Sequence, residues 1–544
     1  MAIATFSRKR FEKEITKITP EIEEKINLFG TPIENLTENE ISIEIFPNRP
    51  DLFSFEGFKR SFLSFLGKEY KKKYEVKKSN YLVYIDENVK DIRPYTVCAV
   101  VKNIKFDDEK IKDVIDVQEK LHATIARNRK KAAIGIYPLE KIEFPIRYLA
   151  KKPSEIHFVP LDSNTKMYGN EILEQHPTGK AYAPLLKGKK LFPIFIDSAN
   201  NILSMPPIIN SNETGKITEK TKDIFIECSG FNLEVLKKIL NILVCMFIDM
   251  NGIAYEVKLI YPNKKIITPA LKEEKIKINI NNINKILGLN LKEKEIKKLL
   301  KKMNYSYINK EVLIPPYRVD ILHEVDIIED IAIAYGYDNI PPEIPSISTI
   351  GKENSREKIK RKISDLLIGL EFIENSSYHL INRELIKKIS NEKNENLIEV
   401  ENSKTDYSIL RHSLVPCVIK ILSENIKAEY PQKIFEIGKV FNLKNDKINE
   451  EERLIVTICS LDSNFTKIKQ VLEYICKMLR ISFEVEETQN NYFIEGRVGK
   501  IVINNKDVGF IGEIHPAILK KFKIKMPTSL FEINLEEIFN IYNP

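Results

Sequence analysis

The amino-acid sequence predicts an α+β protein built from several domains. Its 544 residues exceed what one hydrophobic core supports, and domains of ordinary size divide the chain into about three to five. Segments with a helical spacing of apolar residues are mixed with short runs of β-branched residues. This pattern changes at three places, which defines four predicted domains at residues 1–80, 83–265, 268–345 and 350–544.

Composition and charge exclude several protein classes. The 85 basic and 77 acidic residues leave a formal charge of +8, which permits an anionic partner without demanding one. The six cysteines form no C-x-x-C pair, which argues against a zinc site and against a secreted disulfide framework. The longest apolar stretch contains Asn241 and Asp249, and the first residues, MAIATFSRKRFEKE, lack a hydrophobic signal core. A cytoplasmic protein without membrane contact is therefore expected.

Residues 1–80 predict a small N-terminal α+β domain. A charged helical start is followed by the β-like run ISIEIF, the turn NRPD and the helix FKRSFLSFLG, which Gly67 ends. Within the turn, Pro50 restricts the backbone and Asp51 is a candidate cap for the following helix. Turn chemistry is therefore sufficient to explain these residues.

Residues 83–265 predict a domain that mixes strands and helices. YTVCAVVKNI reads as a strand, VIDVQEKLHATIARNRKKAAIGIY as a helix that runs into a strand, and FPIFID, ILSMPPIIN and DIFIECSG as apolar runs between turns. Three basic residues of the helical stretch, His122, Arg127 and Arg129, are either contacts to a nucleic acid or ordinary packing and solvated residues. Charge runs favour the second interpretation.

Residues 268–345 predict a compact module with two short helices, the second rich in lysine. Ile283, Ile286 and Leu287 precede Gly288 in the first, and a helical spacing of apolar residues continues in EKEIKKLLKKM. Two helices followed by the extended stretch IPPYRVD resemble a winged helix, which suggests nucleic acid. Lysine-rich faces, however, are more often solubilising.

The same module ends in an acidic helix, within YRVDILHEVDIIEDIAIAYGYDNI. Asp326, Glu329 and Asp330 stand at positions i, i+3 and i+4, so they share one helix face and repel one another. A hard cation such as Mg²⁺, with Asp320 reaching in from the preceding extended segment, would relieve that repulsion. The alternative is a solvated face near a helix N-terminus, where negative charge is favoured.

Residues 350–544 predict a further α+β domain. REKIKRKISDLLIGLEFIENSSY is an amphipathic helix that leads into a strand, and IFEIGKVF, RLIVTICS and YFIEGRVGKIVINN are strand-rich.

Several motifs together identify a family. The order R-x-D, five residues, D-x-x-E-D and then YGYDNIPP resembles the magnesium-binding module of the phenylalanyl-tRNA synthetase beta subunit. QEKLHATIARNRKKAAIGIY, LSMPPIINSNETGKIT and TKDIFIECSGFN resemble the editing domain of its shorter, archaeal and eukaryotic type. NRPDL near the start, and ENSKTDYSILRHSLVP, GFIGEIHPAIL and SLFEINL near the end, extend the resemblance to nearly the whole chain.

The resemblance implies roles for the acidic helix and for the last domain. It assigns Mg²⁺ to Asp320, Asp326, Glu329 and Asp330, the last in place of a Glu in the bacterial pattern. It makes the last domain a class II synthetase-like antiparallel-sheet core without catalysis, which docks the alpha subunit. Arg411 and Glu436 stand where an active core places its ATP-binding pair but are far apart in the sequence, and no G-x-x-x-x-G-K-[ST] loop offers another phosphate site.

For the second domain the resemblance implies hydrolysis of tRNA wrongly charged with tyrosine. An apolar pocket for phenylalanine rejects tyrosine only about a hundredfold, because tyrosine merely adds a hydroxyl. A second pocket that demands the hydroxyl discriminates by on the order of 10⁴, because phenylalanine would leave its buried acceptor unpaired. The resemblance places Ser204, Asn210 and Glu227 in or near that pocket, with Glu227 as the acceptor. A strand end, a turn and a pairing with lysine are the respective structural alternatives.

The sequence therefore predicts a beta subunit that supports ATP-dependent attachment of phenylalanine to its tRNA and hydrolyses tyrosyl-tRNA. Its implied partners are an alpha subunit, in a two-plus-two assembly, and the tRNA for phenylalanine, with ATP and phenylalanine bound by the complex. One alternative is a stand-alone nucleic-acid-binding or editing-like protein without an alpha partner. Another is a magnesium-dependent phosphoryl-transfer enzyme, although no Gly-rich phosphate loop is visible.

Overall fold

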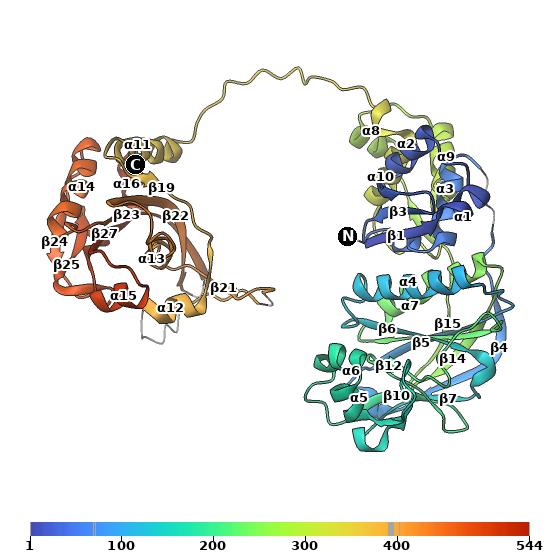
Figure 1. Cartoon of the computed structure of the whole chain (residues 1–544). Helices are drawn as coiled ribbons and strands as arrows, with labels where there is room; N and C mark the ends of the chain where they lie inside the picture. The colour runs from blue at the N-terminus through green and yellow to red at the C-terminus, as the bar shows by residue number, and fades with distance from the viewer. Residues whose placement is uncertain are drawn as a thin grey trace. The chain divides into compact units, whose positions relative to one another are not determined.

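The computed structural model describes residues 2–68, 70, 72–389, 397–401, 403–445 and 447–542. They form two compact units, Met1–Ile344 and Pro345–Pro544 (Figure 1). Both units combine helices with sheets, so the predicted multidomain α+β architecture is confirmed. Among the helices of these described residues, none has the length and apolar character that a membrane crossing needs.

The first unit begins with a three-stranded antiparallel sheet in the order β1-β3-β2. Its strands are β1 (Ala2–Ser7), β2 (Ile33–Leu36) and β3 (Glu40–Ile45), and its helices are α1 (Arg8–Glu14), α2 (Pro20–Leu28) and α3 (Phe55–Phe65). The helix α3 begins where the Ser54 hydroxyl accepts a hydrogen bond from the Gly57 amide at 3.0 Å. The predicted cap, Asp51, is wrong: it is buried and accepts two hydrogen bonds from Arg49 instead.

A ten-stranded sheet forms the middle of this unit, in the order β12-β11-β10-β7-β4-β14-β5-β13-β6, with β15 paired to β14. The strands are β4 (Val76–Ile85), β5 (Tyr95–Lys102), β6 (Ala132–Pro138), β7 (Ile146–Lys151), β10 (Phe192–Ile196), β11 (Ile202–Met205), β12 (Ile209–Asn210), β13 (Ile224–Gly230), β14 (Ile253–Ile260) and β15 (Lys265–Thr268). The separate pair β8 (His157–Phe158) and β9 (Met167–Tyr168) lies outside it. Because β4 pairs with β7 and β14, the predicted domain start at residue 83 cuts through a strand of this sheet.

The middle part of this unit also contains helices. They are α4 (Asp108–Ala123), α5 (Gly169–Gln175), α6 (Pro177–Tyr182) and α7 (Leu233–Asp249). Figure 1 shows α4 and α7 along one face of the sheet, and α7 is buried there because nearly every residue after its second turn is apolar.

The third part of the unit contains the two predicted short helices. They are α8 (Ile280–Leu287) and α9 (Glu293–Lys302), and they precede the acidic helix α10 (Glu324–Tyr335). Gly288 ends α8 in the left-handed conformation, at a φ of 65°, which glycine adopts without a steric penalty. A small antiparallel sheet completes the part, with β16 (Glu274–Lys277), β18 (Glu311–Ile314) and β17 (Ser306–Ile308) in that order.

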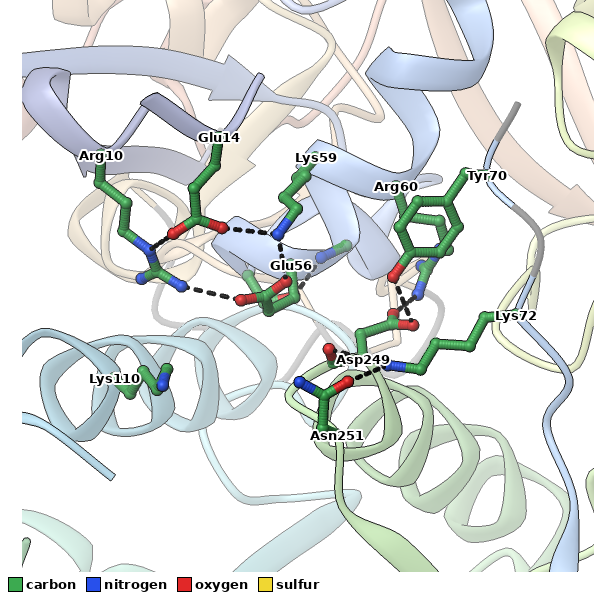
Figure 2. Close-up of polar contacts among 12 residues, drawn as sticks. Arg10, Glu14, Glu56, Lys59, Arg60, Tyr70, Lys72, Lys110, Asp249 and Asn251 are labelled. Atoms are coloured by element: carbon green, nitrogen blue, oxygen red, sulfur yellow. Dashed lines mark hydrogen bonds and ion pairs between the residues drawn. The ribbon is translucent and has the colours of Figure 1, made fainter. Parts of the chain in front are cut away.

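Buried ion pairs join these parts into one unit, as Figure 2 shows. Arg10 of α1 and Lys59 of α3 both bind Glu56, at 2.8 and 3.3 Å. Arg60 of α3 pairs with Asp249 at the end of α7, and both side chains are almost completely buried. The Glu56 pairs lie inside the N-terminal part, whereas Arg60 with Asp249, and Arg10 with Asp113 of α4 at 3.3 Å, hold this part against the middle of the unit, because charges removed from water are stable only with such partners.

The second unit is built on a seven-stranded sheet in the order β19-β22-β23-β27-β26-β25-β24. Every neighbouring pair is antiparallel except β19 with β22. The strands are β19 (Ile373–Glu374), β22 (Gln432–Lys444), β23 (Lys447–Cys459), β24 (Glu484–Glu487), β25 (Phe493–Ile503), β26 (Lys506–Ile514) and β27 (Thr528–Asn534), and β20 (Leu380–Asn382) pairs separately with β21 (Tyr407–Leu410).

Helices cover both faces of the seven-stranded sheet. The helices α11 (Ser355–Gly369), α14 (Phe465–Met478) and α16 (Glu536–Tyr542) pack on the face that carries Phe435 and Leu454. The helices α12 (Arg383–Ile389), α13 (Val415–Glu424) and α15 (Pro516–Lys521) contribute to the core on the face that carries Ile434 and Ile455. Neighbouring residues of a strand point to opposite faces of the sheet, and helices cover both faces. Ile434 and Phe435 of β22 are therefore both buried, as are Leu454 and Ile455 of β23.

Candidate functional site

The predicted pocket residues of the middle sheet lie together. Glu227 is in the centre of β13, opposite Gly135 of the end strand β6. Ser204 of β11 and Asn210 of β12 are register partners. The hydroxyl of Tyr137, also on β6, connects the two strand pairs, at 3.2 Å from Glu227 Oε1 and 3.4 Å from Asn210 Oδ1. The structure therefore brings the three predicted residues into one cluster, while their roles stay predictions.

Tyr137 is the residue of this cluster that the sequence prediction missed. In a strand, residues 135 and 137 share a face, so Tyr137 points to the same side as Gly135. A Cβ atom on Gly135 would lie 2.2 Å from the Tyr137 hydroxyl and 2.6 Å from Glu227 Oε1. The absence of a side chain there makes room for the hydroxyl, and a glycine inside a strand is the sequence signal for such a close approach.

The carboxyl group of Glu227 is unusual because it is almost fully buried and its hydrogen bond among the described residues comes from the neutral Tyr137 hydroxyl. Burial raises the pKa of Glu227 to about 8, against smaller opposing effects of the Tyr137 hydrogen bond and of Arg93. The carboxyl is therefore mostly neutral at pH 7. Its Oε2 atom and the Ser204 hydroxyl have no hydrogen-bond partner among the described residues, and the predicted alternative of a lysine partner for Glu227 is wrong.

A cavity of about 460 Å³ opens beside this cluster. Glu227 and Asn210 contribute to its wall, together with apolar residues of α4 and β6 and the loop that joins β11 to β12. A largely apolar cavity with a few convergent polar atoms and a perturbed carboxyl group is the usual form of a small-ligand site. This cavity is therefore the candidate functional site of the first unit.

Two of the three basic residues singled out in the sequence belong to the cavity wall. His122 is buried, and its Nε2 accepts a hydrogen bond from the Ile134 amide at 2.9 Å. Arg129 donates to the Ile208 carbonyl oxygen at 2.8 Å and to Glu119 at 3.1 Å. Both therefore have structural contacts that hold the wall of the cavity in place, as the packing interpretation predicts.

The four carboxylates of the acidic region do not converge on one point. Arg318 donates to Asp320 at 2.9 and 2.7 Å and pairs with Asp330 at 2.7 Å. Asp330 is buried and also accepts a hydrogen bond from Tyr305. Burial opposes the charge of Arg318, but the two neighbouring carboxylates hold its pKa well above the usual range. A guanidinium group thus occupies the position between Asp320 and Asp330.

The other two carboxylates have different surroundings. One oxygen of Asp326 accepts hydrogen bonds from the Leu322 and His323 amides, both at 2.8 Å, and so caps α10. Glu329 is exposed. Within the described residues, no group of three or more Asp, Glu, His or Cys side chains could hold a metal ion. In this arrangement the predicted ligands do not fit Mg²⁺.

In the second unit, Arg411 and Glu436 are close in space although 25 positions separate them. Arg411 Nη1 lies 2.7 Å from Glu436 Oε1, and both side chains are almost fully buried. The same guanidinium also donates to the Ser377 hydroxyl and to the Lys439 carbonyl oxygen, both at 2.7 Å. The two residues, far apart in the sequence, thus meet in the fold, and the arginine is committed to internal partners rather than available to a phosphate.

Comparison with known proteins finds matches along the chain. Family models match the B3/4 domain over residues 77–241, the tRNA synthetase B5 domain over residues 276–337, and the phenylalanyl tRNA synthetase beta chain CLM domain over residues 340–535. The first match covers the strands of the candidate site, and the second contains the acidic helix α10.

Similar whole proteins and a solved structure agree with these matches. The phenylalanine–tRNA ligase beta subunit of Archaeoglobus fulgidus is 39% identical over 551 residues, which cover 99% of each chain. That of Thermococcus sibiricus is 39% identical and covers 90% of each chain. The crystal structure of an N-terminal fragment of the phenylalanyl-tRNA synthetase beta subunit from Pyrococcus horikoshii is 38% identical, with a TM-score of 0.59, and covers 61% of this chain and 99% of the fragment.

Proposed function

The chain belongs to the family of phenylalanine–tRNA ligase beta subunits, and from this premise we propose how its parts contribute to the ligase. It is a subunit of an aminoacyl-tRNA ligase. The proposed assembly contains two such chains and two alpha subunits in the cytoplasm. In it the alpha subunit attaches phenylalanine to its tRNA with ATP, and this chain supports the reaction.

The second unit is proposed to be a class II synthetase-like core without catalysis that docks the alpha subunit. Its sheet is almost wholly antiparallel, and the internal contacts of Arg411 argue against ATP chemistry on this chain. The third part of the first unit, with α8, α9 and its small sheet, is proposed to be winged-helix-like. The alternative of a stand-alone protein is not favoured, because relatives that match the full length are named as subunits.

The partner proposal predicts a stable complex. Tagged chain recovered from its own cells should bring down a catalytic alpha subunit in about equal amount, and the recovered complex should attach phenylalanine to tRNA. Chain that is recovered alone, at a salt concentration that preserves other synthetase complexes, would contradict the proposal.

Hydrolysis of tyrosyl-tRNA is proposed to take place in the candidate cavity. The observation that carries this proposal is Glu227, a buried and largely neutral carboxyl group at the wall of a cavity large enough for an aminoacyl group. A neutral carboxyl can accept a hydrogen bond at one oxygen and donate one at the other, so it recognises a hydroxyl of either orientation. Phenylalanine has no such group and would leave the buried oxygens unpaired, which costs binding energy.

In this mechanism the chain binds and orients the ester, and water is the nucleophile. No described residue of the cavity wall forms a Ser/His/Asp or Cys/His arrangement for covalent catalysis. His122, a wall residue, has its Nε2 engaged by the Ile134 amide, so that nitrogen is unavailable as a base.

The test is to add tyrosyl-tRNA and phenylalanyl-tRNA separately to the purified chain and to measure ester loss. Only the tyrosyl ester should be lost faster than in buffer, and equal rates for both would refute selective editing.

Magnesium stays a proposed ligand of the acidic helix, and no step above depends on it. Binding requires Asp320 and Asp330 to exchange Arg318 for the ion, since both are paired with that residue. A calorimetric titration of the chain with Mg²⁺ should show saturable binding that Asp326→Asn weakens at least about tenfold. The matched control is Asp338→Asn, outside the predicted ligand set, which should bind as the unchanged chain does. Absence of binding by the unchanged chain would leave the acids as cap and ion-pair partners only.

A further inference from the structure

The Tyr137 hydroxyl occupies the position that the proposed function reserves for a substrate. Editing requires Glu227 to meet the phenol of a tyrosyl group. In the structure Glu227 Oε1 already lies 3.2 Å from a phenol oxygen, which belongs to Tyr137 of the same chain. Asn210 Oδ1, from the second strand pair, lies 3.4 Å from the same oxygen.

The remaining pocket residue also lies close to this phenol. Burial and the neighbouring Glu227 raise the pKa of the Tyr137 hydroxyl, and the adjacent Ser204 hydroxyl acts in the opposite direction. All three residues predicted to recognise a tyrosine hydroxyl therefore surround the hydroxyl of one internal tyrosine. A phenol hydroxyl has a single proton, so Tyr137 donates to one acceptor at a time, and its oxygen fills the space beside Glu227 Oε1 that a second phenol would need.

The position of Tyr137 is well defined by packing. Its side chain is fully buried, and its ring lies 6.0 Å from that of Phe225 on the neighbouring strand β13. The space above Gly135 accommodates its hydroxyl. An aromatic side chain held in this way leaves its place only if the surrounding residues move as well.

From these contacts we propose that Tyr137 is an internal competitor of the tyrosyl group, and that it limits the preference of the editing pocket for tyrosine over phenylalanine. The inference rests on the proposed editing function. With Tyr137 in place, Glu227 offers only its unpaired Oε2 to a ligand. Without the Tyr137 hydroxyl, both carboxyl oxygens lack a partner, and only a ligand that carries a hydroxyl satisfies them.

The test compares Tyr137→Phe with the unchanged chain. The ligands are 3′-deoxyadenosines that carry tyrosine or phenylalanine through a stable 3′-amide, and dissociation constants are measured for each. Tyr137→Phe should raise the preference for the tyrosyl ligand about tenfold, as expected for one hydrogen bond to a buried group. Tyr137→Ala is the second variant, because it also removes the ring; if it folds, it should raise the preference at least as far.

A matched control is Tyr148→Phe. Tyr148 is equally buried in the same sheet and donates its hydroxyl to the Arg93 carbonyl oxygen at 2.9 Å, outside the candidate site. Its variant loses one internal hydrogen bond as Tyr137→Phe does, but the preference between the two ligands should stay unchanged. A preference raised equally in both variants would attribute the effect to general loosening and overturn the inference.

Other outcomes separate this inference from the proposed function. An unchanged preference in the Tyr137 variants, or no binding of either ligand by any chain, overturns the inference. If the unchanged chain hydrolyses tyrosyl-tRNA and Tyr137→Phe is no more selective, the proposed function stands and the inference fails. If Tyr137→Phe gains preference for the tyrosyl ligand but no chain hydrolyses tyrosyl-tRNA, the inference stands and the proposed editing function fails.

Discussion

Replacing Glu227 with glutamine is expected to stabilise the chain at neutral pH and to slow its hydrolysis of tyrosyl-tRNA. The pKa of the buried carboxyl is about 8, against 4.5 for an ordinary glutamate. At pH 7 the folded chain therefore retains a proton that the unfolded chain has released. Retaining this proton lowers the free energy of unfolding at pH 7 by on the order of 3 kcal/mol. Glutamine is neutral at every pH, so the variant does not lose this stability.

The pH dependence of this gain has a definite sign. Below about pH 4.5 both states of the unchanged chain bind the proton, so the variant has no advantage. As the pH rises from 4.5 to 8, only the unfolded state loses the proton, and the unchanged chain becomes progressively less stable than the variant. Above about pH 8 the difference is constant.

Denaturant unfolding at pH 5 and pH 7.5 measures this difference in the free energy of unfolding. Glu174→Gln is the control, because Glu174 is exposed in the same unit and its replacement should change that free energy by less than about 0.5 kcal/mol at either pH. A Glu227→Gln variant whose advantage does not grow between these pH values would contradict the perturbed carboxyl.

The same Glu227→Gln variant should lose editing while synthesis continues. Ester loss from tyrosyl-tRNA should slow at least about tenfold, because Tyr137 occupies the amide oxygen and the amide nitrogen can only donate, whereas the second carboxyl oxygen of Glu227 can also accept the proton of the tyrosine hydroxyl. Phenylalanine attachment by the complex should be unchanged, since that site is proposed to lie on the alpha subunit. Equal ester loss in the variant and the unchanged chain would remove Glu227 from the mechanism.

Replacing Arg318 with methionine is expected to destabilise the first unit by about 3–5 kcal/mol. Arg318 is buried and binds both Asp320 and Asp330. Its removal leaves two neighbouring carboxylates, one of them buried, without their positive partner. The free energy of unfolding, measured by denaturant titration at pH 7, tests this expectation.

Arg147→Met is the matched control for this experiment. Arg147 pairs with Asp86 at 3.0 Å in the same unit, but its side chain is 56% exposed, so its loss should cost less than about 1 kcal/mol. Equal effects of the two replacements would mean that the Arg318 contacts contribute no more than an ordinary surface ion pair.

Periodicity in the sequence was sufficient to predict much of the local structure. The two short helices before the acidic helix, and the capping glycine Gly288, are present as predicted. These features depend on residues within one or two turns of each other, which is the range over which spacing rules apply. The Asp51 cap failed although its neighbours are local: Arg49 binds both oxygens of Asp51, Arg60 lies within ion-pair distance, and Ser54 caps α3 instead.

The candidate site likewise combines features that the sequence predicts with contacts that only the fold creates. Ser204, Asn210 and Glu227 were found by their resemblance to a family pattern, because no spacing rule relates residues on different strands. Tyr137 was missed because an apolar strand predicts its burial but not its partners. Its hydrogen bonds to residues 73 and 90 positions away exist only once the strands have paired.

By itself, the sequence determined the α+β class, the main helices and strands, the family and the identity of the candidate pocket residues. Only the tertiary structure decided which charged and polar groups meet. It placed Arg318 between two acids predicted to bind a metal, joined Arg411 to Glu436, and set the Tyr137 hydroxyl against Glu227. The physical reason is that secondary structure follows from short-range spacing, whereas a buried polar group takes whichever partner the packing of distant segments brings within about 3 Å.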